Sequence, residues 1–200
     1  MTTVGFWGSI HQDEMQKKFG WDDGKTIALF DRFQPDVVCG EVRRSDYESN
    51  ADYQGPREYR QFIFNYCKER GIPFIPCDFF RDEDIELAQR PLDVPDEEAV
   101  KEYQRLIEEF FAVGGGSIPP FNSPAFNEVV RRKQAFQQKY GPEAHEIIWN
   151  QRNHEIAENI KAVVKENEGK NILVIFGAEH TYWLVEELGK LEGVSIRFPL

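Results

Sequence analysis

Cysteine is scarce in this sequence of 200 residues, which contains only Cys39, Cys67 and Cys77. None of the three belongs to a C-x-x-C pair, and their number is odd. Neither a disulfide framework nor a cysteine-rich metal site is therefore expected. We interpret them as reduced thiols in the core, which is typical of a cytoplasmic protein.

Long apolar runs and a basic, apolar leader are also missing. No stretch approaches the roughly 20 apolar residues that a membrane-spanning helix requires. The first residues, Met1 to Gly5, lack the basic and apolar regions of a signal peptide. The sequence therefore predicts a protein that has no membrane as a partner.

Basic residues are fewer than acidic residues. The sequence has 24 Lys and Arg and 35 Asp and Glu, which gives a net charge of −11. Nucleic-acid binding relies on clustered Lys and Arg, so a nucleic-acid partner is not expected. A small-molecule or peptide substrate is compatible with this charge, and the sequence does not indicate an oligomeric state. The hydrophobic fraction of 40% is sufficient for a core, and the length indicates a single domain over 1–200.

Strand-like and helix-like segments alternate along the chain. Apolar runs predict strands over 3–10, 36–41, 73–78, 172–176 and 194–198. Alternation of this kind predicts an α/β fold, with a mostly parallel central sheet and helices on both faces. Residues 81–141 have a helical pattern of their own, and we expect a helical insertion that caps the site. Its segment 114–120 is rich in glycine and is either a plain connector or the hinge of a lid.

Two histidines occur in the same local pattern, a buried strand followed by G-x-x-H. The first copy ends at His11 and the second at His180, and the chain has only four histidines. Ligands bind at the carboxyl ends of the strands in parallel sheets. We therefore predict that His11 and His180 belong to one site.

Carboxylates end two of the other predicted strands, the second at Glu41 and the third at Asp78. Histidines and carboxylates can hold a divalent ion that keeps one position open for water. Such an ion lowers the pKa of the bound water to about 7. Without a metal, one histidine acts as a general base that a carboxylate orients. Both versions stay open, and Asp78 is also a plausible helix N-cap.

A helix is predicted over 143–167, and its apolar stripe extends back through Arg152, Trp149 and His145. Arg152 therefore faces the core, where it can stabilise an oxyanion or hold a substrate carboxylate. The alternative is a purely structural ion pair between Arg152 and Glu41. His154 falls on the solvent side of the same helix.

Taken together, four motifs resemble those of the TraB/Tiki (GumN-like) family in order and rough spacing. They are Gly8-x-x-His11, Pro35-Asp36-Val37-Val38 followed by Glu41, Arg152-Asn153, and Gly177-Ala178-x-His180. The resemblance covers about 1–48 and 148–190. The family is related to the erythromycin esterases and to the ChaN-like haem-binding proteins.

The resemblance implies a hydrolase that cleaves a peptide or ester bond, with His11, Glu41, Arg152 and His180 as catalytic residues. In its metal-dependent form, His11, Glu41 and His180 would hold a divalent ion, for which the family favours manganese or cobalt over zinc. The ChaN-like branch implies the alternative, a non-catalytic protein that binds a small ligand or haem.

Three further residues are expected to contact the substrate: Arg43, Asn153 and Glu179. Arg43 follows the second strand, and Asn153 belongs to the Arg-Asn motif. Glu179 departs from the family pattern, which has a small residue before the second histidine, so it would crowd or recharge the site.

Overall fold

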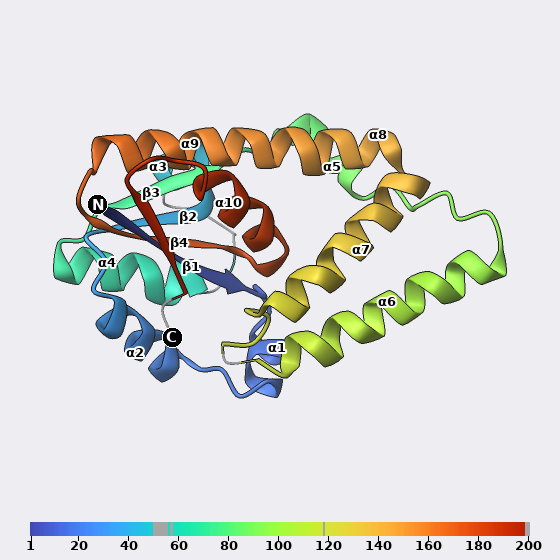
Figure 1. The fold of residues 1–200 in the computed structure, drawn as a ribbon, viewed down its shortest axis with the longest axis horizontal. Coiled ribbons are helices and arrows are strands. Elements are labelled where there is room, and N and C mark those ends of the chain that lie inside the picture. The colour runs from blue at the N-terminus through green and yellow to red at the C-terminus, as the bar shows by residue number, and fades with distance from the viewer. Residues whose placement is uncertain (50–55, 57, 118, 199–200) are drawn as a thin grey trace.

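Five parallel strands form the centre of the protein, in a computed structural model that describes residues 1–49, 56, 58–117 and 119–198. The order across the sheet is β3-β2-β4-β1-β5, and every pairing is parallel. The predicted α/β fold is therefore confirmed (Figure 1). The strands are β1 (Thr2–Ser9), β2 (Val37–Arg43), β3 (Phe74–Asp78), β4 (Asn171–Gly177) and β5 (Val194–Arg197).

Strand β4 lies in the middle of the sheet, between β2 and β1. Its apolar run from Ile172 to Phe176 is buried on both faces, which explains why it does not alternate with polar residues. Strand β2 continues to Arg43 and so ends two residues later than predicted. The register between β2 and β3 shifts between Gly40 and Arg43, so Glu41 lies at an irregular point of the strand.

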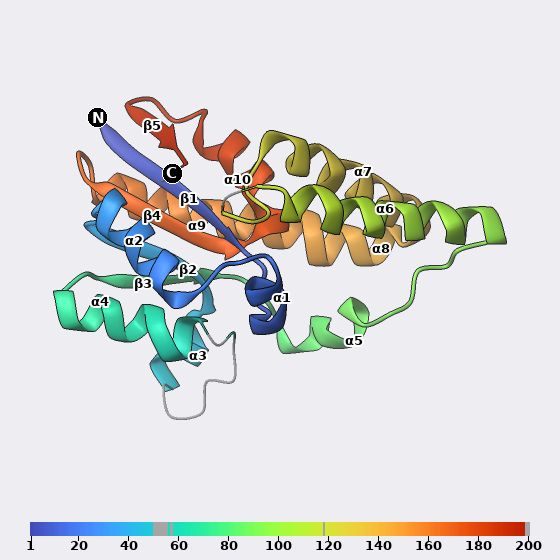
Figure 2. The same ribbon diagram turned by 90° about the horizontal axis from the view of Figure 1, so that it is seen from below.

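Helices cover both faces of the sheet, as predicted (Figure 2). Helices α9 (Arg152–Glu166) and α10 (Thr181–Leu188) pack on one face through an aliphatic core. Helices α2 (Asp23–Phe33) and α4 (Phe64–Arg70), with the π-helical segment η1 (Glu58–Ile63), pack on the other through an aromatic core. Short helices complete the fold: α1 (Asp13–Lys18), α3 (Arg44–Ser49) and α8 (Pro142–Ala144).

Residues 81–141 are mainly helical, as expected. After η2 (Asp82–Asp84) and α5 (Ile85–Ala88), the long helices α6 (Glu97–Gly115) and α7 (Pro124–Tyr140) pack against each other. We call α6 and α7 together the arm. It projects from the side of the molecule toward which the strand arrows point (Figure 1), so it stands beside the carboxyl ends of the strands.

The glycine-rich segment differs from the expected loop, because Gly114 and Gly115 belong to helix α6. A Cβ atom on Gly114 would lie 2.1 Å from the ring of Phe121, and one on Gly115 would lie 2.2 Å from the ring of Phe19. These glycines therefore permit close packing of aromatic rings. Residue 118 of the predicted segment lies outside the described residues.

The predicted helix over 143–167 is present in three consecutive parts: α8, the π-helical segment η3 (His145–Gln151) and α9. π-Helical turns occur often at functional sites, and η3 runs directly into Arg152. The cysteines Cys39, Cys67 and Cys77 are buried free thiols. Within the described part of the chain, no helix combines the length and the apolar character needed to cross a membrane.

Candidate functional site

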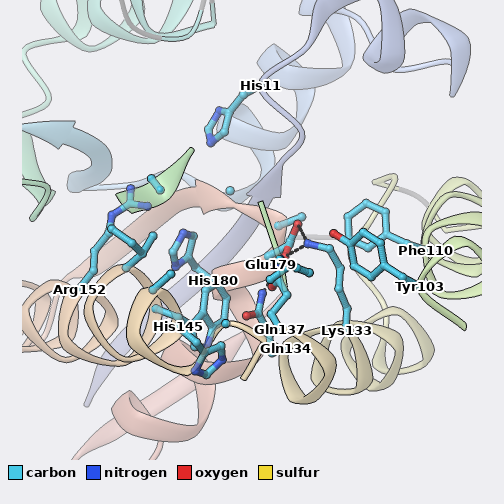
Figure 3. A pocket seen from close by; sticks show the side chains of 18 of the residues that line it. His11, Tyr103, Phe110, Lys133, Gln134, Gln137, His145, Arg152, Glu179 and His180 are labelled. Carbon is cyan, nitrogen blue, oxygen red and sulfur yellow. Dashed lines mark hydrogen bonds and ion pairs between the residues drawn. The ribbon is translucent and has the colours of Figure 1, made fainter. Parts of the chain in front are cut away.

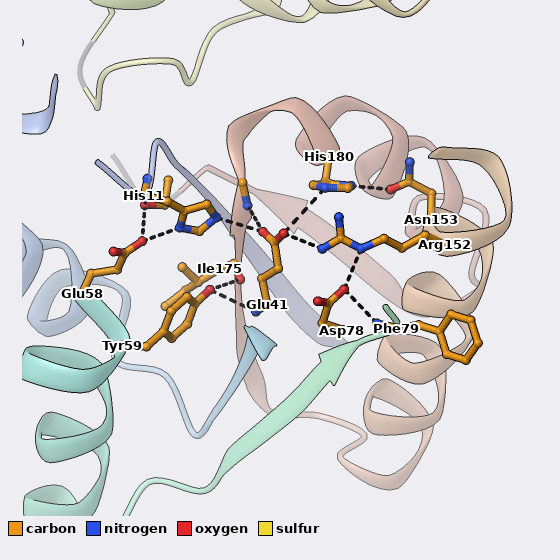
Figure 4. A network of polar contacts seen from close by, with 12 residues as sticks. His11, Glu41, Glu58, Tyr59, Asp78, Phe79, Arg152, Asn153, Ile175 and His180 are labelled. Atoms are coloured by element: carbon orange, nitrogen blue, oxygen red, sulfur yellow. Dashed lines mark hydrogen bonds and ion pairs between the residues drawn. The ribbon is translucent and has the colours of Figure 1, made fainter. Parts of the chain in front are cut away.

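The two G-x-x-H motifs lie side by side at the carboxyl ends of neighbouring strands. Strands β1 and β4 pair with Gly8 opposite Phe176 and Ser9 opposite Gly177. His11 follows the end of β1, and His180 ends the short 3-10 helix η4 (Ala178–His180) that follows β4. The structure therefore brings His11 and His180 to one site (Figure 4).

The glycine of each motif is needed because another group approaches its backbone. A Cβ atom on Gly8 would lie 2.8 Å from the Cα atom of Ala178, in the second motif. A Cβ atom on Gly177 would lie 3.1 Å from Glu41 Oε2 and 3.2 Å from His11 Nε2. The glycines thus let the strand ends and the polar side chains come together.

His11 is held between two carboxylates. Its Nδ1 lies 2.5 Å from Glu58 Oε1, and its Nε2 lies 2.9 Å from Glu41 Oε2. Burial favours the neutral ring, but Glu41 and Glu58 outweigh it and raise the pKa of His11 to about 10. His11 is therefore protonated at neutral pH and donates from both nitrogens. Its backbone has a φ of 54°, a strained conformation that is found most often at functional sites.

His180 has the opposite character. Its Nδ1 donates to Asn153 Oδ1 at 2.6 Å, and its ring stacks on Trp149 at a centroid distance of 4.9 Å. Burial lowers the pKa of His180 to about 4, and the opposing effect of Glu41 is smaller. The ring is thus neutral at neutral pH. Because its proton is on Nδ1, the unprotonated Nε2 is directed toward Glu41 Oε1, 3.8 Å away.

Glu41 joins the two histidines. Its Oε2 accepts hydrogen bonds from His11 and from the backbone N–H of Gly177, at 2.9 and 2.5 Å. Its Oε1 accepts one from Nη2 of Arg152, at 2.7 Å. Burial would raise the pKa of Glu41, but the charge and hydrogen bond of His11, with help from His180 and Arg152, hold it well below its usual range. Glu41 is therefore ionised.

Arg152 lies between two carboxylates, since its Nε also donates to Asp78 Oδ1 at 2.9 Å. The side chain of Arg152 is only 16% exposed, so the predicted orientation of this residue toward the core is confirmed. Burial raises the pKa of Asp78, and the charge of Arg152 opposes that effect. The site is thus a row of alternating charges from Glu58 through His11, Glu41 and Arg152 to Asp78 (Figure 4).

A cavity of about 930 Å³ lies between these residues and the arm. His11, Glu41, Arg152 and His180 line one end, which we call the polar end. The part lined by α6, α7 and the segment before α6 is called the arm end. In Figure 3, His11 and Arg152 face Tyr103 and Phe110 across the cavity, with Glu179 between them.

Glu179 lines the cavity and is bound by helix α7. Both of its carboxylate oxygens accept from Lys133 Nζ, at 2.8 and 2.7 Å, and Oε2 also accepts from Gln134. The extra charge expected from Glu179 is therefore neutralised by the arm. The same contacts link the arm to the residue directly before His180.

The other two residues expected to contact a substrate lie elsewhere. Asn153 is completely buried and bonds to His180, so it orients that ring. Arg43 pairs with Asp46 and Asp82 and does not line the cavity. A substrate contact of Asn153 or Arg43 therefore stays a prediction, and the positions of the two side chains do not support it.

The described residues include no group of three or more His, Cys, Asp or Glu side chains that could hold a metal ion. Glu41 already accepts hydrogen bonds from Arg152, His11 and the backbone N–H of Gly177. The metal-dependent version of the site stays a prediction, and the contacts present do not fit it.

Two residues of the site were not foreseen from the sequence. Glu58 follows no strand, and it reaches His11 and Ser9 from the start of η1. Lys133 belongs to a helix, where a lysine is ordinarily exposed to solvent, yet Lys133 is only 9% exposed. No strand end or repeated motif in the sequence points to Glu58 as a partner of His11.

Comparisons with known proteins add little to this geometry. No protein-family profile matches the chain, and no curated protein matches it. Among solved structures, the chain is similar to an erythromycin esterase mutant, EreC in its open conformation, with a TM-score of 0.33 and 13% sequence identity. The similarity covers 88% of this chain and 60% of the other, so this chain spans less than two thirds of that protein. A similarity this distant supports no conclusion about the site.

Proposed function

We propose that this protein is a hydrolase that cleaves an ester or peptide bond by acid–base catalysis at His11 and His180. The observation that carries the proposal is the opposite protonation of two histidines on either side of Glu41 in one cavity. Pairs of groups whose environments drive their pKa values apart are typical of acid–base sites. At neutral pH, His180 has a free lone pair and His11 has a proton to give.

In the proposed reaction, a water molecule bound to His180 Nε2 attacks the substrate carbonyl carbon. A C–O bond forms, the carbonyl π electrons move to oxygen, and Nε2 takes the proton of the water. When the tetrahedral intermediate collapses, the bond to the leaving oxygen or nitrogen breaks, and His11 protonates that atom. The products are a carboxylic acid and an alcohol or amine.

Arg152 and Glu41 have separate roles in this scheme. Arg152 uses Nε and Nη2 for Asp78 and Glu41, which leaves Nη1 for the developing oxyanion. Glu41 provides the return path of the proton, since its oxygens lie 3.8 Å from His180 Nε2 and 2.9 Å from His11 Nε2. The family resemblance of the sequence implies the same four catalytic residues: His11, Glu41, Arg152 and His180.

The proposal is tested by assaying His11→Ala and His180→Ala on p-nitrophenyl acetate and on a peptide library, with and without manganese. Loss of His180 should reduce kcat on both substrates by about 100-fold or more, and loss of His11 should do so on peptides, whose amine leaving group needs the proton, while circular dichroism shows a folded protein. The matched control is His154→Ala, which removes an exposed histidine of helix α9. Full activity of both site variants would contradict the proposal.

A metal requirement and a non-catalytic role are two further possibilities that the same assay distinguishes. A TraB/Tiki-type enzyme would require manganese or cobalt for activity, and activity in the presence of a chelator would instead favour the metal-free scheme. The non-catalytic alternative, a protein that binds a small ligand or haem, predicts no turnover of any ester or peptide in the same assay.

A further inference from the structure

We propose that the arm end of the cavity binds a neutral, extended apolar group of the substrate. The inference rests on the proposed function, because it assigns the part of the substrate that lies beyond the cleaved bond. It is carried by the pairing of charges, the composition of the walls and the size of the cavity.

The charged residues described at the arm end already have partners of opposite charge. Lys133 and Glu179 bind each other, and Lys133 Nζ also lies over the ring of Phe110, 5.5 Å from its centroid. Arg90 pairs with Glu143. A charged group of a ligand that competed for Lys133 or Glu179 would leave a partly buried charge without its partner. A neutral group has no such cost.

The walls of the arm end are apolar, with uncharged polar groups between them. Leu92, Val94 and Phe110 provide apolar surface, and Tyr103 and Gln137 provide neutral hydrogen-bonding groups. Sites for small ligands commonly have this composition, with mostly apolar walls and a few polar groups that set orientation. The polar end differs, because the ionised residues of the catalytic row are concentrated there.

The volume of the cavity indicates that the group is extended. At about 930 Å³, the cavity is near the upper end of the ~300–1,000 Å³ that is usual for ligand sites. A substrate with a short acyl group would occupy only the polar end. An apolar group that continues past Glu179 would displace water from the walls of the arm end, and this release stabilises binding.

The test uses N-phenyl-1-naphthylamine, a neutral apolar dye whose fluorescence rises on binding, and 1-anilinonaphthalene-8-sulfonate, which has the same rings and one sulfonate. We expect the unmodified protein to bind the neutral dye, and the sulfonate to bind at least about 10-fold more weakly. Equal affinity for the two dyes, or no binding of the neutral dye, would overturn the proposal.

The location of the dye is tested with a matched pair of variants on helix α7. Gln137 lines the cavity, whereas its neighbour Gln138 is exposed and does not. Gln137→Trp fills the arm end and should raise the Kd of the neutral dye by about 10-fold or more, whereas Gln138→Trp should leave it within about twofold. Ala144→Phe narrows the cavity from helix α8 and should act like Gln137→Trp. An unchanged Kd in both cavity variants would place the dye elsewhere and refute the inference.

Ester hydrolysis separates this inference from the proposed function. In the unmodified protein, kcat/KM should be higher for p-nitrophenyl octanoate than for the acetate. Gln137→Trp should remove that preference, whereas the control Gln138→Trp should leave both the preference and acetate hydrolysis unchanged. If no ester is hydrolysed but the dye results hold, the proposed function fails and the binding site stands. If esters are hydrolysed without any dependence on chain length or on Gln137, the binding site fails alone.

Discussion

The side-chain oxygen of Asn153 lies 2.6 Å from Nδ1 of His180, and both residues are buried. An amide oxygen can only accept a hydrogen bond, so the proton of the neutral imidazole is on Nδ1. The lone pair of Nε2 is then available on the side of the ring that faces Glu41 and the cavity. Asn153 thus determines which nitrogen of His180 acts as the base.

Replacing Asn153 by Asp should keep the acceptor but add a negative charge beside His180. A nearby opposite charge favours the protonated imidazole, so the pKa of His180 should rise from about 4 by about one unit or more. The acidic limb of the pH–rate profile should move to higher pH by the same amount. Histidine ring NMR and kcat/KM between pH 3 and 8 provide the measurement. An unchanged acidic limb would show that His180 is not the base.

Replacing Glu58 by Gln should lower the pKa of His11 below its value of about 10. The amide oxygen of Gln can still accept from His11 and Ser9, but the charge that helps to hold the proton on His11 is lost. The basic limb of the pH–rate profile should therefore move to lower pH, with the rate at pH 6 reduced by less than about 10-fold.

The control for this variant is Glu69→Gln, which changes an exposed carboxylate of helix α4. It should leave both limbs of the profile in place. If Glu58→Gln also leaves the basic limb in place, His11 does not act as the acid in the rate-limiting step.

Replacing Arg152 by Met should destabilise the protein by roughly 3–5 kcal/mol, because it leaves Asp78 buried without its cation and removes one of the two cations that pair with Glu41. The matched control is Arg132→Met, which removes an exposed ion pair with Glu109. Exposed pairs contribute about 1 kcal/mol or less. Urea unfolding at pH 7 should therefore separate the two variants clearly. Equal stability would show that Arg152 is not essential to the network.

Much of the site could be predicted from sequence because parallel sheets concentrate strand ends along one edge. The positions of His11, His180 and Glu41 follow from that rule together with three apolar runs. Arg152 follows from a helical stripe that continues the core-facing positions. Each of these inferences needs only the local periodicity and one topological principle.

The remaining contacts depend on tertiary structure that local pattern does not encode. Glu58 reaches His11 across 47 positions of sequence, and Lys133 reaches Glu179 across 46. Gly114 was assigned to a loop because glycine disfavours helices, but tight packing against Phe121 outweighs that preference. Arg43 was expected near a substrate, whereas the bulge in β2 and the carboxylates of Asp46 and Asp82 hold it outside the cavity.

The last prediction concerns the pH dependence of stability, in which the two histidines act in opposite directions. The pKa of His11 is raised from 6.5 to about 10 on folding, so its contribution is fully present below pH 6.5 and is lost as the pH rises through 10. The pKa of His180 is lowered from 6.5 to about 4. Its contribution is therefore present above pH 6.5 and is lost as the pH falls through 4.

Variants isolate each contribution when the free energy of unfolding is measured in urea from pH 4 to pH 10. The stability difference between wild type and His11→Gln should be constant below pH 6.5 and shrink between pH 6.5 and 10. The difference for His180→Gln should be constant above pH 6.5 and shrink toward pH 4. His154→Gln, at an exposed position, should follow wild type throughout. If both site variants instead show differences that do not change with pH, the two histidines titrate normally, and the opposite protonation states on which the proposed reaction depends do not exist.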